Sequence, residues 1–324
     1  MTTDFPWLDT LQGAAAIDVA DRCGLLADIA GDGDISARPA LLENLLIGAG
    51  VVVREDSGLA FTKAFMVAWR ADSAAIVARA SFIRRAAADV AMGLDELVFD
   101  LPAFMKKSAT FRLFRYDMAE DTTPAHLKAT RPWVDYVEAL SRSESPHLVP
   151  IIDIRDGDRI LEIGGNTGVM SAALIAAYSG VTACIFDLPA VCHLGRERNN
   201  DSRLEFVSGD ARKLDALDRF HGVVDVVLFK SVLHDWPAED AEEMLVRAMK
   251  LLAPGGRIIV CERDAFGPDD AIKNCTHTVT NMVFSPFYRD SQFYLDIMSR
   301  RGLAVTQKSV QLDMTFHATI GTCK

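Results

Sequence analysis

The first half of the chain has a mostly helical pattern of apolar and polar positions. Apolar residues recur at helical spacing over residues 11–30 and 39–49, and Gly31-Asp-Gly-Asp separates the two segments. Residues 51–61 then read as two short strands around an Asp-Ser-Gly turn. The pattern therefore predicts helices followed by a small hairpin.

Two more helices are predicted after this hairpin. One is Ala-rich and runs from Asp72 to Met92; the other runs from Pro132 to Leu140, and Ser141-Arg-Ser-Glu-Ser-Pro146 is expected to end it. Helix, helix and hairpin form the outline of a winged-helix unit. Because no helix of this region gathers Lys and Arg on one face, we expect it to serve packing and dimerisation and not DNA binding.

The second half of the chain alternates short apolar runs with helical segments, which favours an α/β fold with a mostly parallel sheet. The predicted strands are 159–163, 181–187, 204–207, 223–229 and 256–261, followed by two at the end of the chain, 303–312 and 315–323.

A glycine-rich turn follows the first of these strands, in Leu161-Glu-Ile-Gly-Gly-Asn-Thr-Gly168. Strand, glycine turn and helix form a cradle in which backbone N–H groups can approach a nucleotide-like ligand. Asp187 ends the next predicted strand, 23 residues beyond Gly164, close to the spacing at which an acid receives ribose hydroxyls. On this evidence NAD and S-adenosylmethionine (SAM) both remain open.

The charge and composition of the chain argue against nucleic-acid-binding and membrane proteins. The formal net charge of −11 over 324 residues speaks against a broad surface for nucleic acid or anionic membranes. No run of about 18 apolar residues occurs, and the first residues lack a basic segment followed by an apolar stretch. We therefore expect a cytoplasmic protein that binds neither nucleic acid nor membrane.

Five segments in a fixed order resemble the plant caffeate O-methyltransferase family of SAM-dependent enzymes, which has many bacterial small-molecule members. They are the glycine turn 161–168, Phe186-Asp-Leu-Pro189, Gly209-Asp210, Phe229-Lys-Ser-Val-Leu-His-Asp-Trp236 and Leu252-Ala-Pro-Gly-Gly256. A dehydrogenase would not be expected to carry the His-Asp-Trp segment after its fourth strand. The resemblance thus favours SAM over NAD.

The resemblance implies a fold and a domain organisation. The fold is α/β, with a Rossmann-like class I methyltransferase domain whose doubly wound sheet is mostly parallel. We expect a winged-helix-like dimerisation domain over 1–95, a helical connector contributing to the acceptor pocket over 96–147, and the SAM-binding catalytic domain over 148–324. The family habit further predicts a homodimer through the N-terminal domain and a small-molecule acceptor.

Matching positions imply which residues hold SAM. Gly164 and Gly165 are expected near its methionine part, Asp187 at the ribose, Asp210 by the adenine, and Lys230 closing the pocket. All of these follow predicted strands, at the sheet edge where open α/β sheets bind their ligands. The full predicted set is Glu162, Gly164, Gly165, Asp187, Leu188, Gly209, Asp210, Ala211 and Lys230.

The resemblance also implies a catalytic pair. His234 matches the general base of the family, and imidazole suits that role because its ordinary pKa lies near neutrality. Glu262, 28 residues further on, matches the carboxylate that orients the imidazole and stabilises it once protonated.

One stretch departs from the family pattern and opens a second acceptor chemistry. Ser285-Pro-Phe-Tyr-Arg-Asp290 keeps Arg289 but has Tyr288 where a second glutamate beside the base is usual. Some bacterial relatives methylate the carbon next to the carbonyl of a 2-oxo acid with a metal. Here His234, Asp235 and His277 would supply ligands for iron or zinc, and Arg112 or Arg115 would pair with the carboxylate of the acceptor. Tyr288 and Arg289 are further candidates for the acceptor site.

Several functions remain open from the sequence. The expectation leans slightly to metal-assisted carbon methylation, with metal-independent methylation of a phenol or hydroxyl by His234 as the alternative. A SAM-sensing winged-helix regulator is a candidate from another class, although the acidic charge and the His234 and Glu262 pair argue against it. A relative that keeps SAM without transferring its methyl group is a third.

Overall fold

The protein is divided into two compact units. The computed structural model describes residues 6–31, 39–56, 58–271 and 275–323. One unit comprises Met1–Phe114 with Gly267–Phe284, and the other Arg115–Phe266 with Ser285–Lys324. The units differ from the domains predicted at 1–95, 96–147 and 148–324, whose roles in dimerisation and acceptor binding stay predictions.

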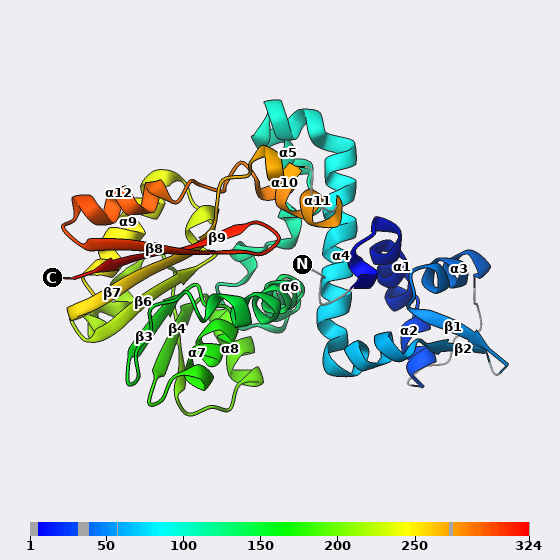
Figure 1. The fold of residues 1–324 in the computed structure, drawn as a ribbon, viewed down its shortest axis with the longest axis horizontal. Coiled ribbons are helices and arrows are strands. Elements are labelled where there is room, and N and C mark those ends of the chain that lie inside the picture. The colour runs from blue at the N-terminus through cyan, green and yellow to red at the C-terminus, as the bar shows by residue number, and fades with distance from the viewer. Residues whose placement is uncertain (1–5, 32–38, 57, 272–274, 324) are drawn as a thin grey trace. The chain divides into compact units, whose positions relative to one another are not determined.

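The first unit is helical and carries one hairpin (Figure 1). The strands of the predicted hairpin pair antiparallel, with Val52 opposite Phe61. The helix predicted over 11–30 is instead two helices, because Gly24 takes a left-handed conformation with a φ of 80°. The elements are η1 (Pro6–Leu8), α1 (Leu11–Arg22), α2 (Leu25–Ala30), α3 (Ala40–Gly48), β1 (Val52–Glu55), β2 (Gly58–Phe61), α4 (Lys63–Phe99), α5 (Leu101–Lys107), η2 (Phe111–Leu113), α10 (Pro268–Ala271) and α11 (Cys275–Phe284).

Helix α4 is longer than predicted, and its kinks explain why the sequence pattern gave a shorter helix. The backbone leaves helical geometry at Asp72 and Gly93, so the predicted segment is the middle part of a longer helix. The carboxylate of Asp72 accepts a hydrogen bond from the N–H of Ala75 (3.0 Å) and caps that middle part. Helix α11 belongs to this unit, since its Phe284 ring stacks on Phe82 of α4 with centroids 6.1 Å apart.

The second unit is a seven-stranded sheet covered by helices on both faces (Figure 1). The strand order is β5-β4-β3-β6-β7-β9-β8, parallel from β5 to β7, with β9 antiparallel to both of its neighbours. The elements are η3 (Tyr116–Met118), α6 (Pro124–Leu148), β3 (Arg159–Ile163), α7 (Val169–Ala177), β4 (Thr182–Asp187), α8 (Pro189–Arg198), β5 (Leu204–Ser208), η4 (Leu214–Phe220), β6 (Val224–Lys230), η5 (Leu233–Asp235), α9 (Ala238–Met249), β7 (Leu252–Arg263), α12 (Gln292–Arg300), β8 (Ala304–Gln311) and β9 (Thr315–Thr322). All seven strands predicted for the C-terminal half are present.

The alternation of side chains along each central strand builds two cores. Leu161 and Ile163 of β3 pack with residues of α9 and α12, whereas Ile160 packs with Met170 and Leu174 of α7 on the other face. Strand β3 pairs with both β4 and β6, so the order of the strands reverses at β3. Ligands of doubly wound sheets bind at this switch point, beyond the carboxyl ends of the strands. Within the described ranges, no helix has the length and apolar character that a membrane span needs.

The break predicted at Ser141–Pro146 is wrong, because α6 continues to Leu148 with Pro132 and Pro146 inside it. Tertiary contacts hold this polar segment helical. The Ser145 hydroxyl donates to the Ser141 carbonyl (2.6 Å), and the buried Glu144 carboxylate pairs with Lys230 and Arg263. Partners distant in the sequence thus override a local signal for a helix end.

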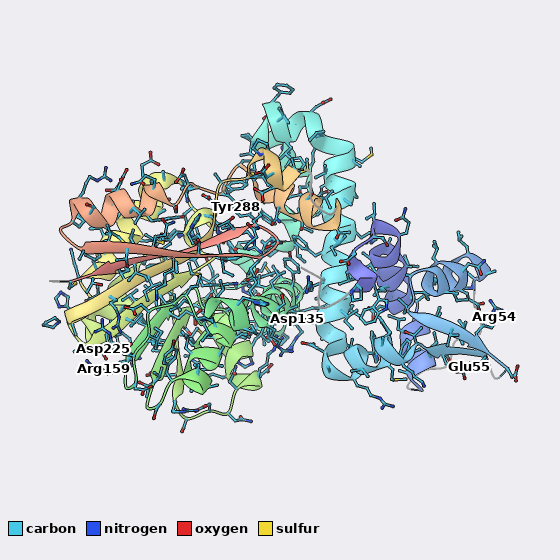
Figure 2. The ribbon with its side chains drawn as sticks, in the orientation of Figure 1. Arg54, Glu55, Asp135, Arg159, Asp225 and Tyr288 are labelled. Carbon is cyan, nitrogen blue, oxygen red and sulfur yellow. The ribbon has the colours of Figure 1, made fainter. Side chains whose placement is uncertain are left out.

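Two ion pairs near the amino ends of the central strands allow a matched stability test. Arg257 is fully buried and pairs with the carboxylate of Asp158, whereas Arg159 pairs with Asp225 at the surface (2.8 Å; Figure 2). Arg257→Met should lower the free energy of unfolding by about 3–5 kcal/mol, because Asp158 is left buried without its counter-charge. Arg159→Ala should change it little. Equal losses for both variants in urea unfolding would contradict the difference that burial predicts.

Candidate active site

The glycine turn lies between β3 and α7 and is closely packed. Gly164 has a φ of +71°, and its N–H donates to the carbonyl of Phe186 in β4 (2.7 Å). A Cβ on Gly164 would lie 2.6 Å from a methyl group of Val232, and one on Gly165 would lie 2.9 Å from the Glu162 side chain. Larger residues would therefore push into the β6 loop or the strand below, so the packing of the turn requires glycine at both positions.

Asn166 stands at the third position of the turn, directly after Gly164 and Gly165. It adopts the left-handed conformation, with a φ of 53°, which Asn tolerates better than most residues. Its N–H donates to one oxygen of Asp187 (2.8 Å), and the Leu188 N–H donates to the other (2.7 Å). Asp187 thus ties the turn after β3 to the end of β4, and each carboxylate oxygen keeps acceptor capacity for a further donor.

Glu162 is buried beneath the same turn. Its carboxylate accepts hydrogen bonds from the Ser171 hydroxyl (2.5 Å) and, more weakly, from the Ser171 N–H (3.2 Å) at the first turn of α7. Burial raises the pKa of Glu162 to about 7, against the opposing effects of Ser171 and Lys230. Glu162 therefore braces the start of α7, and its carboxyl group titrates near neutral pH.

The loop after β5 lies against the end of β4. The Gly209 N–H donates to the Asp187 carbonyl (2.9 Å), and a Cβ on Gly209 would lie 2.3 Å from the ring of Phe186. Asp210 follows, with its carboxylate held by the guanidinium of Arg212 (3.0 and 2.8 Å). Ala211 packs against the core. The carboxyl ends of β3, β4 and β5 thus bring the predicted SAM residues of these three loops to one edge of the sheet.

Lys230 ends β6 and is buried in an ionic cluster. Its ammonium group pairs with Glu144 and lies 3.3 Å from the Ser141 hydroxyl, both on α6. Glu144 also accepts from Arg263 (2.6 Å), which contacts Asp313 as well (3.2 Å). In the described structure Lys230 therefore joins α6 to the sheet, and its predicted contact with SAM stays a prediction.

His234 and Glu262 meet at the carboxyl ends of β6 and β7. The Nδ1 atom of His234 lies 2.5 Å from one Glu262 oxygen, and the other oxygen accepts from the N–H groups of Val232 and Leu233 (2.8 Å each). Burial alone would lower the pKa of His234, but the negative charges of Glu262 and Asp235 raise it above its usual value. The pair thus holds the imidazole in a fixed orientation at the sheet edge that carries the glycine turn.

The other ring nitrogen of His234, Nε2, lies 3.4 Å from a carboxylate oxygen of Asp235. The second oxygen of Asp235 accepts from the Tyr116 hydroxyl (2.9 Å). Tyr288 (Figure 2) approaches the His234 ring edge-on, with centroids 5.4 Å apart. The carboxylate of Asp235 therefore lies beside Nε2, the nitrogen that does not bond to Glu262, and Tyr288 lies against the ring.

The structure gives the predicted arginines other partners. The guanidinium of Arg289 donates to the backbone carbonyls of Leu233 (2.8 Å) and Trp236, so it fixes the His234 loop. Arg115 forms a forked pair with Asp117 (2.8 and 2.7 Å). Both guanidinium groups are engaged within their own unit. Pairing with the carboxylate of an acceptor would require them to exchange these partners.

Two predicted residues belong to the other compact unit. Arg112 lies in η2 with an exposed side chain, and His277 lies in α11, but its side chain is outside the described residues. Among the described side chains, no group of three or more His, Cys, Asp and Glu residues is arranged to hold a metal ion. The proposed set of His234, Asp235 and His277 is therefore not assembled by what the structure describes.

Comparisons with known proteins agree with this geometry. The O-methyltransferase domain family matches residues 135–304, more than half of the chain. The chain belongs to this family. Acetylserotonin O-methyltransferase of Bos taurus is 30% identical over 124 residues, and demethylspheroidene O-methyltransferase of Rhodobacter capsulatus is 32% identical over 123. Each alignment covers 37% of this chain, and 34% and 30% of the respective relatives, so it spans about a third of their length.

Solved structures of O-methyltransferases show the same fold over nearly the whole chain. Mitomycin 7-O-methyltransferase MmcR has a TM-score of 0.69 at 21% identity, covering 96% of this chain and 94% of its own. Human N-acetylserotonin methyltransferase, solved with SAM, has a TM-score of 0.71 at 14% identity, covering 97% and 94%. The predicted Rossmann-like class I methyltransferase fold with a helical N-terminal part is confirmed.

Three residues of this candidate site were not predicted from the sequence. Glu144 lies in a segment that its Ser and Pro content marked as a helix end, and Tyr116 lies among aromatic residues that are expected to fill a core more often than a pocket. Arg212 is two residues beyond Asp210, and that short spacing is the one sequence signal for its pairing.

The buried carboxyl group of Glu162 predicts a dependence of stability on pH. The unfolded chain releases this proton near pH 4.5, whereas the folded protein holds it until about pH 7, so the free energy of unfolding should fall as the pH rises between these values. The amide of Glu162→Gln can still accept from Ser171 but cannot ionise. The variant should lose a pH-dependent contribution on the order of 3 kcal/mol. Parallel curves of unfolding free energy against pH for both proteins would contradict this prediction.

Proposed function

We propose that this protein transfers the methyl group of SAM to a hydroxyl group of a small organic acceptor, with His234 as the general base. The observation that carries the proposal is the His234–Glu262 pair at the sheet edge that also holds the glycine turn, Asp187 and Asp210. Family membership supports the methyl transfer, and the relatives are named as O-methyltransferases. The activity of the whole chain is part of this proposal, because the matched relatives are aligned over only about a third of their length.

The described residues fit SAM. The turn at Gly164 and Gly165 leaves no space for side chains, and Asp187 keeps acceptor capacity for ribose hydroxyls. Asp210 would face the adenine end. Bound SAM supplies a methyl group activated by the positive sulfonium. The chain has to hold an acceptor hydroxyl in line with that group and remove its proton, and much of the rate comes from this positioning.

His234 is arranged to take the proton at Nε2. Because Glu262 accepts from Nδ1, the neutral ring carries its free lone pair on Nε2. Once Nε2 is protonated, the charge of the imidazolium lies between Glu262 and Asp235 (3.4 Å), which stabilise it. Glu262 itself stays ionised: burial raises its pKa, but His234 and the N–H donors of Val232 and Leu233 outweigh burial and lower it.

Oxygen methylation agrees better with these contacts than the metal-assisted carbon methylation to which the sequence expectation leans. Asp235 accepts from Tyr116, and among the described side chains no group of three or more His, Cys, Asp and Glu residues is arranged to hold a metal ion. Arg115 is paired with Asp117. The similar proteins named above also carry names of oxygen methylation, for acetylserotonin, demethylspheroidene and mitomycin.

Substitution at His234 tests the proposal directly. His234→Asn should lower kcat about 10²- to 10⁴-fold, the usual contribution of a general base, while the Kd for S-adenosylhomocysteine stays near the wild-type value. His193→Asn is a matched control, because His193 forms a similar His–Glu pair with Glu197 (3.1 Å) on the exposed surface of α8. The measurement is methyl transfer to a panel of aromatic hydroxyl compounds. Unchanged turnover in His234→Asn would contradict the role of the base.

We further propose a homodimer formed through the first unit. Large apolar side chains are exposed on the last part of α4, with Met92 and Phe99 each 86% exposed and Val98 61% exposed. An apolar surface of this kind favours contact with a protein partner. A second copy of the same chain is the simplest partner, because self-association requires no other protein. Dimerisation would cover these side chains.

The exposed end of α4 gives a direct test of the dimer. Phe99→Glu places a charge in the surface that would become buried and should shift the protein from dimer to monomer in analytical ultracentrifugation. Val223→Glu is a control, because Val223 is an exposed apolar residue (40%) of the second unit. A wild-type protein that sediments as a monomer at micromolar concentration would contradict the proposal.

A further inference from the structure

The guanidinium of Arg212 joins two loops that start from different strands of the sheet. One loop follows β5 and carries Asp210; the other follows β6 and carries His234 and Trp236. Strands β4 and β3 lie between β5 and β6 in the sheet. Arg212 donates two hydrogen bonds to the Asp210 carboxylate (3.0 and 2.8 Å), and its Cζ lies 4.8 Å from the centroid of the Trp236 ring. One side chain therefore contacts both loops.

Both ends of this contact are fixed by other groups. The N–H of Arg212 also donates to Asp210 (2.9 Å), and its carbonyl accepts from Arg247 of α9 (3.1 Å). Trp236 packs against the core, and its carbonyl accepts from Arg289, which holds the His234 loop. Asp210, Arg212 and Trp236 therefore form one continuous set of contacts.

Arginine is suited to this double contact and lysine is not. The planar guanidinium presents two parallel N–H donors to a carboxylate while its face lies on an aromatic ring. A lysine ammonium keeps the charge but cannot make the forked pair and the planar contact together. The substitution Arg212→Lys therefore separates the geometry of the contact from its charge.

We propose that Arg212 is a positioning residue that couples the adenosine end of the SAM site to the segment carrying His234. The inference rests on the proposed function, which assigns Asp210 to the adenine. Arg212 fixes the orientation of the Asp210 carboxylate, and Trp236 fixes Arg212. Binding at Asp210 should therefore depend on a tryptophan that belongs to the acceptor side of the site.

A double-mutant cycle with S-adenosylhomocysteine tests the coupling. Arg212→Lys and Trp236→Leu should each raise the Kd measured by calorimetry about 3- to 30-fold, and the double variant should be no weaker than the weaker single variant, because both remove one contact. Trp236→Phe keeps a ring and should restore most of the affinity. The melting temperature without ligand should stay near that of the wild type, while the increase caused by S-adenosylhomocysteine becomes smaller.

Arg219 provides a matched control. Its guanidinium pairs with Glu205 (2.7 Å) and lies over the ring of Phe220 (4.6 Å), in the same unit but without contact to Asp210 or Trp236. Arg219→Lys should leave the Kd unchanged. Wild-type affinity in Arg212→Lys, or effects of the two single variants that add in the double variant, would overturn the coupling. A wild-type protein that does not bind S-adenosylhomocysteine would instead contradict the proposed function and this inference together.

Discussion

The carboxylate of Glu262 is the contact on which the arrangement of the candidate active site depends. It stands near the end of β7 and reaches the loop after β6, where it binds one ring nitrogen of His234 and two backbone N–H groups. The chain enters this loop through Ser231, which has a left-handed φ of 54°. Such a conformation costs free energy for a residue other than glycine, and the surrounding bonds hold it in place. Arg289 binds two carbonyls of the same loop, so charged side chains satisfy both its donors and its acceptors.

Acidic side chains also bind the neighbouring loops at the other strand ends of the switch point. Glu162 braces the start of α7, Asp187 binds the backbone of the glycine turn, and Asp210 holds Arg212. Each acid stands at or just after the carboxyl end of a strand and orders the loop beside it. These side chains thus give the loops at the switch point fixed partners within the protein, and fixed polar groups of this kind are what preorganised active sites are built from.

Local patterns predicted the strands well and the partners of charged side chains poorly. The apolar runs around Ile160 and Val226 fill two cores, so their strands could be read from the sequence. The end of α6 could not be read from the sequence, because Glu144 is stabilised by Lys230 and Arg263, which lie 86 and 119 residues away. Arg115 and Arg289 were predicted at the acceptor site because of their residue type. In the structure Arg115 pairs with the neighbouring Asp117, and Arg289 donates to two backbone carbonyls. The partners of Glu144 and Arg289 are distant in the sequence and leave no local signal.

The central claim is that His234 and Glu262 promote methylation of a hydroxyl oxygen. The most direct test is to incubate the protein with SAM carrying a ¹³C-labelled methyl group and a panel of aromatic hydroxyl compounds and 2-oxo acids, and to record the ¹³C NMR spectrum of the products. The account predicts a labelled methyl bound to oxygen in at least one hydroxyl compound, and its loss in His234→Asn. Label found on carbon alone, or on no acceptor, would contradict it.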